Sequence, residues 1–173
     1  FGEILGEDFQ ASVLTEGSGK QYGITHNYFK FHAACALNHS VLDALAHALG
    51  MKIHHGSYPP FTVTGNHPDP KLIKKITVTV SKRSMRLAVN AKENELSSKF
   101  SIPYAVATFL VNGTASVDSF RCPNLGKAQV KDVMEKVEVV CSPEFTARWP
   151  IEDVAEIKIE MADGNFLQGK CSN

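Results

Sequence analysis

The sequence predicts an α+β fold in which helices pack on a mostly antiparallel sheet. Apolar residues recur at every second position in residues 76–81, 85–89, 137–141 and 155–161, a pattern typical of half-buried strands. Residues 41–49, 97–112 and 127–135 instead show features of helices. Turn signals beside the strands indicate hairpins, which join antiparallel strands.

The first predicted helix begins beside Asn38 and Ser40, both of which are good N-cap residues. Gly50 stands where a glycine would end it. The apolar residues of this helix fall on one face: Val41, Leu42, Leu45, Ala48 and Leu49. This segment is therefore expected to bury that face against the rest of the domain.

The later elements are also delimited by their end signals. Residues 82–84 are predicted to form the hairpin turn between strands 76–81 and 85–89. Pro103 is tolerated only near the first turn of a helix, so the regular helix is expected to begin close to Ser101. Asp163-Gly164 is a strong turn signal that closes the strand at 155–161.

Length and composition indicate one globular domain, or one domain with a tail. The chain has 173 residues, of which 43% are hydrophobic and 21% are charged. Its 18 basic and 18 acidic residues cancel, so we expect neither nucleic acid nor an anionic membrane as a partner. No apolar run approaches the roughly 20 residues that span a bilayer. We expect a cytoplasmic location, or a mitochondrial one if a targeting segment has been removed.

Cysteine and histidine spacing does not favour a metal site or a disulfide framework. Cys35, Cys122, Cys141 and Cys171 form no CxxC pair, so we expect reduced thiols. Residues 54, 55 and 67 are histidines in a predicted loop, but the two neighbours cannot easily face one centre. The His32-x-x-Cys35-x-x-x-His39 run has usable spacing but no evident fourth ligand. We expect no metal.

His39 is the first candidate for chemistry because it lies in the cap or first turn of a predicted helix. Unpaired backbone N–H groups concentrate positive charge there, which favours a neutral imidazole and a nearby anion. A general base acting on a carboxylate substrate would fit this position. The alternative is a histidine that only caps or packs, and local features alone leave that alternative open.

Three segments resemble the MmgE/PrpD family, which includes 2-methylcitrate dehydratase and cis-aconitate decarboxylase. The first runs from Lys30 to His39 and into the helix, similar to the family's lysine, aromatic, proline, cysteine and histidine pattern. The second is Phe-Ser-Ile-Pro-Tyr-Ala-Val-Ala at 100–107, and the third is the strand and turn at 154–164. Two departures are Ala33, in place of the proline, and Ala36, in place of a basic residue.

The resemblance implies that this chain corresponds to the smaller α+β lid domain of the family, without its large helical domain. Residues 1–25 would then be a connecting segment and residues 26–173 the lid-like domain. We therefore expect an excised, processed or truncated chain that is inactive alone. The missing helical domain is the expected partner, and the complete enzyme is expected to be a homodimer.

By position, His39 resembles the family's catalytic lid histidine and Tyr104 its active-site tyrosine. The implied reaction is the dehydration or decarboxylation of a small di- or tricarboxylate without any cofactor. A neutral His39 would move the proton beside a carboxylate, and Tyr104 would donate a hydrogen bond to the developing charge or the leaving hydroxyl. Lys30 would hold a substrate carboxylate, although an exposed lysine with no such role fits equally.

Two other functions fit the same sequence. One is a non-catalytic α+β module whose exposed apolar surface binds another protein chain. The other is a related epimerase, which uses the same proton chemistry without losing water or carbon dioxide. Convergence of His39 and Tyr104 on one concave surface would favour an enzyme over the interaction module.

Overall fold

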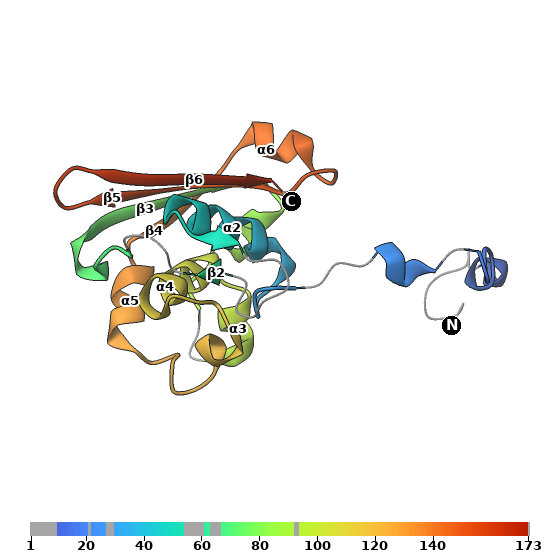
Figure 1. Ribbon diagram of the computed structural model, residues 1–173, viewed down its shortest axis with the longest axis horizontal. Helices are drawn as coiled ribbons and strands as arrows, with labels where there is room; N and C mark the ends of the chain where they lie inside the picture. Colours follow the sequence, from blue (N-terminus) through green and yellow to red (C-terminus); the bar gives the residue numbers. More distant parts are fainter. Residues whose placement is uncertain are drawn as a thin grey trace.

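The computed structural model describes residues 10–20, 22–26, 30–53, 61–62, 67–91 and 94–172. A four-stranded sheet in the order β4-β3-β5-β6 forms its centre (Figure 1). β3 (Ile73–Val80) is antiparallel to β5 (Val154–Met161), and β5 is antiparallel to β6 (Phe166–Ser172). β4 (Val137–Cys141) pairs parallel with β3. The predicted α+β fold with a mostly antiparallel sheet is confirmed.

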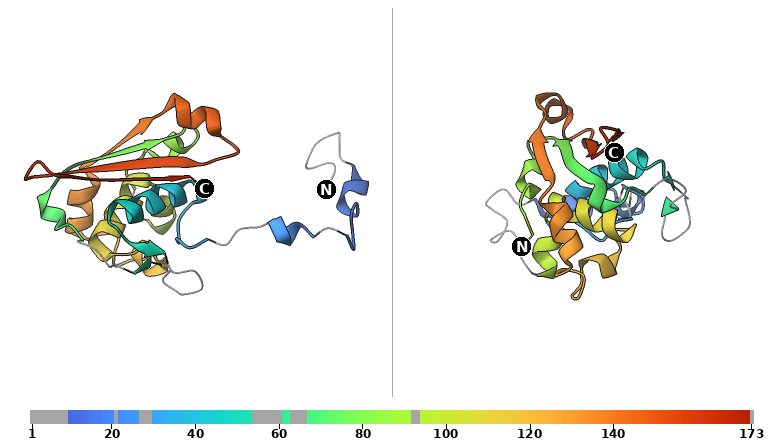
Figure 2. Two further views of the ribbon diagram at one scale, coloured as in Figure 1. Left: turned by 45° about the horizontal axis from the view of Figure 1, so that its top comes forward. Right: turned by 90° about the vertical axis from the view of Figure 1, so that its left-hand side faces the viewer.

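Two helices cover one face of this sheet. α2 (His39–Ala48) packs on β5 and β6, while α4 (Ile102–Asn112) contacts α2, β4 and α5 (Ala128–Met134) (Figures 1 and 2). The sheet face is apolar because alternate side chains of β3 and β5 are fully buried beneath the helices, among them Ile76, Val78, Ile157 and Ile159. The core therefore lies between the sheet and the α2–α4 layer.

Short elements complete the described fold. They are the 3-10 turns η1 (Ala11–Leu14), η2 (Gly23–His26), η3 (Ala36–Asn38), η4 (Pro70–Leu72), η5 (Ser84–Leu87) and η6 (Val117–Phe120), the helices α3 (Glu95–Lys99) and α6 (Pro143–Arg148), and a two-residue antiparallel pair, β1 (Lys52–Ile53) with β2 (Phe61–Thr62).

The predicted hairpin at 82–84, with a second strand at 85–89, is wrong. β3 is followed instead by η5, because the carbonyl of Ser81 accepts hydrogen bonds from the backbone N–H groups of Ser84 and Met85. Ser84 and Leu87 are buried and lie three residues apart, which is the period of a 3-10 helix. Over five residues, the apolar pattern was too short to distinguish a period of two from a period of three.

The predicted helix at 97–112 is two helices in the structure. Its regular part, α4, begins after Ser101, whose side chain caps the helix by accepting a hydrogen bond from the N–H of Tyr104. Gly113 ends it with a positive φ of 73°. The expected start near Ser101 is therefore confirmed, and the residues before it form the separate short helix α3.

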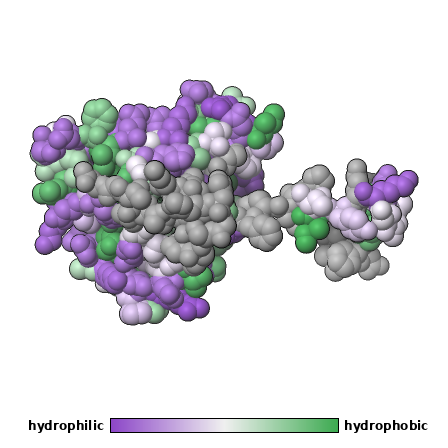
Figure 3. Space-filling model, in the orientation of Figure 1, coloured by the Kyte–Doolittle hydropathy of each residue, from purple (hydrophilic) through white to green (hydrophobic). Residues whose placement is uncertain are grey.

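The described residues before the domain, 10–20 and 22–26, contain no buried side chain and lie apart from the sheet and its helices (Figures 1 and 2). Four large apolar residues there are more than half exposed: Val13, Leu14, Tyr22 and Ile24. On the face of the domain seen in Figure 3, hydrophobic residues are scattered among hydrophilic ones. None of the helices in the described ranges is long and apolar enough to cross a membrane.

A glycine sets the distance between α2 and the edge strand β6. A Cβ atom built on Gly169 would lie 2.1 Å from the carbonyl oxygen of Ala44 and 2.5 Å from the backbone nitrogen of Ala48. Both atoms belong to the backbone of α2, so no side chain can rotate away to make room. Only glycine allows this approach without moving the helix.

Gly169→Ala is expected to lower the free energy of unfolding by about 1–3 kcal/mol, because α2 must shift away from β6 to admit the methyl group. The measurement is urea denaturation followed by circular dichroism. Gly126→Ala is the matched control, since a Cβ atom at Gly126 has no atom within 4 Å. Equal stability of the two variants would contradict the close-contact interpretation.

Candidate active site

The loop before α2 is fixed by hydrogen bonds to residues distant in the sequence. The backbone N–H of Cys35 and the side-chain amide of Asn38 both donate to the carbonyl of Lys99, at 2.9 and 3.0 Å. The N–H of Ala33 donates to the carbonyl of Ala115 at 3.0 Å. Asn38 is thus the N-cap residue by position, as predicted, but its side chain holds the loop to α3 and does not cap α2.

His32 and His39 form a polar cluster with Asp43 at the start of α2. The imidazole of His32 is 3% exposed, and its Nε2 lies 3.0 Å from Oδ1 of Asp43. The His32 and His39 rings meet edge to face, with their centroids 5.3 Å apart. The ring of Phe109 on α4 packs against His32 at a centroid distance of 6.2 Å. The loop, α2 and α4 therefore all contribute to the position of this cluster.

His39 is held in its neutral form. Burial is the main cause that lowers the pKa of His39 to about 4, and the neighbouring His32 and Lys30 lower it further, against the opposite effect of Asp43. The sequence predicted a neutral ring because of the helix N-terminus; the protonation state agrees, but desolvation is the larger cause. The backbone of Ala34 also acts to raise the pKa of His39, and this effect is the smallest of those on the ring.

The Nε2 atom of His39 is buried and has no hydrogen-bond partner. The interaction of the ring with the Ala34 backbone favours the tautomer that carries the proton on Nδ1, and that tautomer leaves a lone pair on Nε2. A buried acceptor without a partner is unfavourable for stability, and such atoms are often retained for function. The ring thus has the protonation state and tautomer of a base at neutral pH.

A pocket of about 470 Å³ opens beside this cluster, a volume within the range of small-molecule sites. Its wall is formed by the loop before α2, by the end of α3 and by η6. The lining residues are Lys30, Phe31, His32, Ala33, Ala34, Cys35, Lys99, Phe100 and Val117. Of the three residues in the cluster, His32 belongs to the pocket wall, and Lys30 lines the same wall.

The structure does not place the hydroxyl of Tyr104 in this pocket. Tyr104 is 3% exposed, and its hydroxyl donates to the carbonyl of Ser119 at 2.9 Å. Burial is the main cause that raises the pKa of Tyr104. Because Ser119 belongs to η6 and η6 also supplies Val117 to the pocket, the hydroxyl in this structure supports one pocket wall from behind. The predicted catalytic role of Tyr104 stays a prediction.

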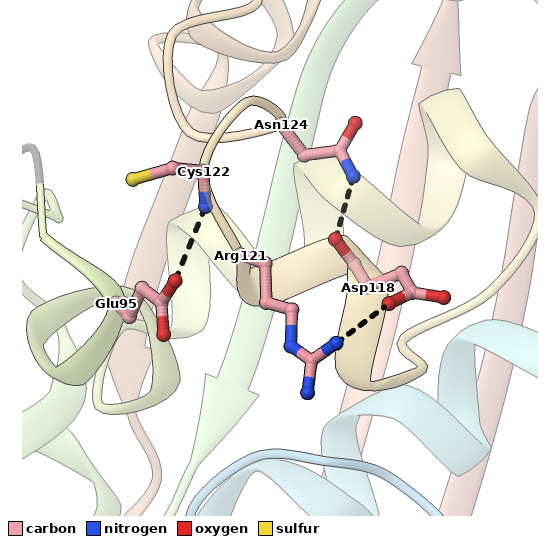
Figure 4. Close-up of polar contacts among 5 residues, drawn as sticks. All are labelled: Glu95, Asp118, Arg121, Cys122 and Asn124. Atoms are coloured by element: carbon pink, nitrogen blue, oxygen red, sulfur yellow. Dashed lines mark hydrogen bonds and ion pairs between the residues drawn. The ribbon is translucent and has the colours of Figure 1, made fainter.

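The chain beyond η6 is held by local polar contacts (Figure 4). The side chain of Asn124 donates to the carbonyl of Asp118 at 2.5 Å, and Arg121 forms an ion pair with the Asp118 carboxylate at 3.5 Å. The N–H of Cys122 donates to the carboxylate of Glu95 on α3 at 3.3 Å. These contacts join η6 to α3, so two walls of the pocket are fixed to each other.

Among the described residues, no group of three or more histidine, cysteine, aspartate or glutamate side chains is arranged to hold a metal ion. Residues 54 and 55, two of the loop histidines, lie outside the described residues. Cys35, Cys122, Cys141 and Cys171 are all free cysteines.

Comparison with models of known families assigns this chain to a family. The model of the MmgE/PrpD C-terminal domain matches residues 32–171. This chain belongs to the MmgE/PrpD family. The match includes His32, His39 and Asp43, and Lys30 lies just before it. Comparison with curated protein sequences gives no match.

The MmgE/PrpD family consists of dehydratase-like proteins that are generally enzymes of the lyase type. The resemblance stated from the sequence is therefore confirmed, as is the α+β fold of this MmgE/PrpD domain. The specific substrate and reaction are separate questions, which depend on the geometry of the pocket.

The sequence predicts His39 and Lys30 as site residues, which stay predictions, but it does not indicate the pairing of His32 with Asp43. The sequence does indicate that His39 and Asp43 lie on one face of the helix, because they are four residues apart. The sequence does not indicate that His32 contacts Asp43, because His32 lies in a loop whose path depends on hydrogen bonds to Lys99 and Ala115. Lys99 was missed for the same reason.

The depressed pKa of His39 makes stability depend on pH. Between pH 6.5 and about 4 the unfolded chain takes up a proton at this residue that the folded MmgE/PrpD domain does not. The contribution of His39 to the free energy of unfolding is thus complete above pH 6.5 and is lost as the pH falls to about 4. As the pH falls from 6.5 to about 4, the free energy of unfolding of His39→Leu, measured by urea denaturation, should decrease less than that of the wild type. An equal loss in both proteins would contradict the neutral assignment.

Tyr104→Phe removes the hydroxyl that donates to Ser119 and is expected to lower the free energy of unfolding by about 1 kcal/mol. The effect is limited because the hydroxyl of Thr108 also reaches the Ser119 carbonyl, at 3.4 Å. Thermal denaturation measures the change, and NMR signals of η6 should shift with it. Unchanged signals at Val117 and Ser119 would contradict the supporting role.

Proposed function

We propose that this MmgE/PrpD domain contributes the acid–base histidine and a carboxylate-binding lysine to a lyase that acts on a small di- or tricarboxylate. The reaction is of the 2-methylcitrate dehydratase or cis-aconitate decarboxylase type. The observation that carries this proposal is the neutral, buried His39 with an unpartnered Nε2, whose ring packs against His32 in the wall of a pocket that Lys30 also lines. His39 itself is not among the residues that line this pocket.

The chemistry needs a base that is neutral near pH 7. In a dehydration, Nε2 of His39 takes the proton from the carbon beside a carboxylate, and the electron pair of that C–H bond stays on the carbon as a carbanion-like intermediate. This pair forms the C=C bond as the C–O bond breaks, and a general acid gives the departing hydroxyl the proton with which it leaves as water. Lys30 binds the carboxylate as a point charge, which stabilises the negative charge that develops beside it.

Tyr104 is proposed as the donor to the leaving hydroxyl or to the developing charge. Its hydroxyl must exchange the Ser119 carbonyl for the substrate in order to act, because it is already bonded in this structure. The phenol is kept protonated by burial, which raises its pKa, and a protonated hydroxyl is the form that donates.

NMR titration of this chain with citrate, 2-methylcitrate and cis-aconitate tests the proposal. Saturable shifts at His39 and at the pocket residues are expected with at least one of these acids. Lys30→Met should weaken that binding about tenfold, because one charge-assisted contact is lost. Lys20→Met is the control, since Lys20 is exposed and belongs to the segment 10–20, which lies apart from the domain. Absence of binding by all three acids would argue against the proposal.

The apolar rim of the pocket favours a second candidate function, a surface that docks another protein segment. Phe31, Phe100 and Val117 line the pocket and are each almost half exposed. Within the proposed enzyme, this rim is where the helical domain of the same protein would bind. In an interaction module, the rim alone would carry the function.

A Phe100→Ser variant separates these two functions. It removes the rim aromatic but leaves His39 and Lys30 in place. In the proposed lyase, carboxylate shifts at His39 persist in this variant, although with weaker affinity, because Lys30 still supplies the charged contact. Absence of these carboxylate-induced shifts from both the wild type and the variant would favour the interaction module.

A further inference from the structure

The pocket beside α2 is distinct in charge from two other surface pockets of the described chain. Those two contain acidic side chains next to their lysines, Asp132 in one and Glu135, Glu138 and Glu160 in the other. The pocket beside α2 contains two lysines, Lys30 and Lys99, and no acidic residue. Two cations without a compensating carboxylate create a positive potential that an anionic ligand would neutralise.

Hydrogen bonds to its carbonyl group fix the main chain of Lys99. It is the last residue of α3, and its carbonyl accepts the two hydrogen bonds that fix the loop before α2, from Cys35 and Asn38. The main chain at Lys99 therefore has a fixed position relative to the loop that begins at Lys30. Within the described part of the chain, neither lysine ammonium forms an ion pair.

The side walls strengthen any charge interaction inside the pocket. Phe31, Phe100 and Val117 stand around it and exclude part of the solvent. Coulomb attraction grows as the effective dielectric constant falls, so a carboxylate here is bound more strongly than on an open surface. The volume of about 470 Å³ is more than one carboxylate group occupies, and it leaves room for a short carbon chain between two of them.

We propose that Lys99 is a second carboxylate-binding residue, and that the ligand of this pocket carries two anionic groups, one bound by Lys30 and the other by Lys99. This inference rests on the proposed function and deepens it, because it assigns a further binding residue and matches each of two anionic groups of the ligand to its own lysine. Lys99 binds and orients the ligand, and it takes no part in proton transfer.

Succinate and butyrate test the inference, because both have four carbons and they differ in one carboxylate. Dissociation constants are measured by NMR titration of the whole chain at a fixed ionic strength. Lys99→Met should weaken succinate binding about tenfold and change butyrate binding less than twofold. Lys99→Arg, which keeps the charge, should stay close to the wild type for both acids. Lys82→Met, which alters an exposed lysine outside the pocket, is the control.

Each outcome has a defined meaning. The substitutions at Lys99 leave its carbonyl in place, so unchanged amide signals of Cys35 and Asn38 will show that the loop is intact. Equal weakening of both acids by Lys99→Met, or weakening of neither, would overturn the second site while the first lysine site stands. Binding of neither acid to the wild type would overturn this inference, and failure with the three larger acids as well would overturn the proposed function.

Discussion

The direct contact between the backbone of α2 and β6 is the constraint on which the rest of the structure depends. At Gly169 the helix and the strand approach so closely that no side chain fits between them. Two polar contacts extend this interface along the helix. Ser40 donates to the Asp153 carboxylate at 3.1 Å, and Nδ1 of His47 lies 3.0 Å from the carbonyl of Lys170. Contacts at both ends and in the middle fix the rotation of α2 about its axis.

This rotation decides where His39 and Asp43 point. They lie one turn apart, so they share a side of α2, toward the preceding loop and α4. Because an adjacent side of the helix is occupied by β5 and β6, the cluster forms where Phe109 and the loop close over it. The site is therefore a consequence of the helix–sheet packing, and local sequence around His39 supplies only one part of it.

The sequence allowed most of the fold to be predicted, because long periodic segments fix the type of an element. The strands at 137–141 and 155–161 and the helix at 127–135 were expected and are present within one residue. The segment at 85–89 was wrong because a five-residue pattern fits two periods. β6 was not predicted beyond the turn at Asp163-Gly164, since its side chains alternate only between exposed and half-buried.

The candidate site was predictable only in part, for a different physical reason. His39 and Lys30 could be proposed as candidates because helix starts and family motifs are local features. The partners of these residues are set by tertiary contacts, such as the Lys99 carbonyl that fixes the loop. The inward hydroxyl of Tyr104 likewise depends on η6, a turn that has no periodic pattern. Residues brought together by such contacts leave no spacing rule in the sequence.

The electrostatics of the cluster link ligand binding to the strength of the base. Lys30 is one of the groups that lower the pKa of His39, so its charge keeps the imidazole a weak base while the pocket is free of anions. A carboxylate that binds Lys30 compensates this charge and adds a negative one near the ring, and both effects raise the pKa of His39. Removal of water by the ligand acts in the opposite direction, because desolvation disfavours the imidazolium ion. Where the anion contacts Lys30 directly, its charge has the larger effect on the pKa of His39. A charge a few ångströms away outweighs a small further loss of solvent around a ring that is already largely buried. His39 would thus become a stronger base when an acid substrate is bound.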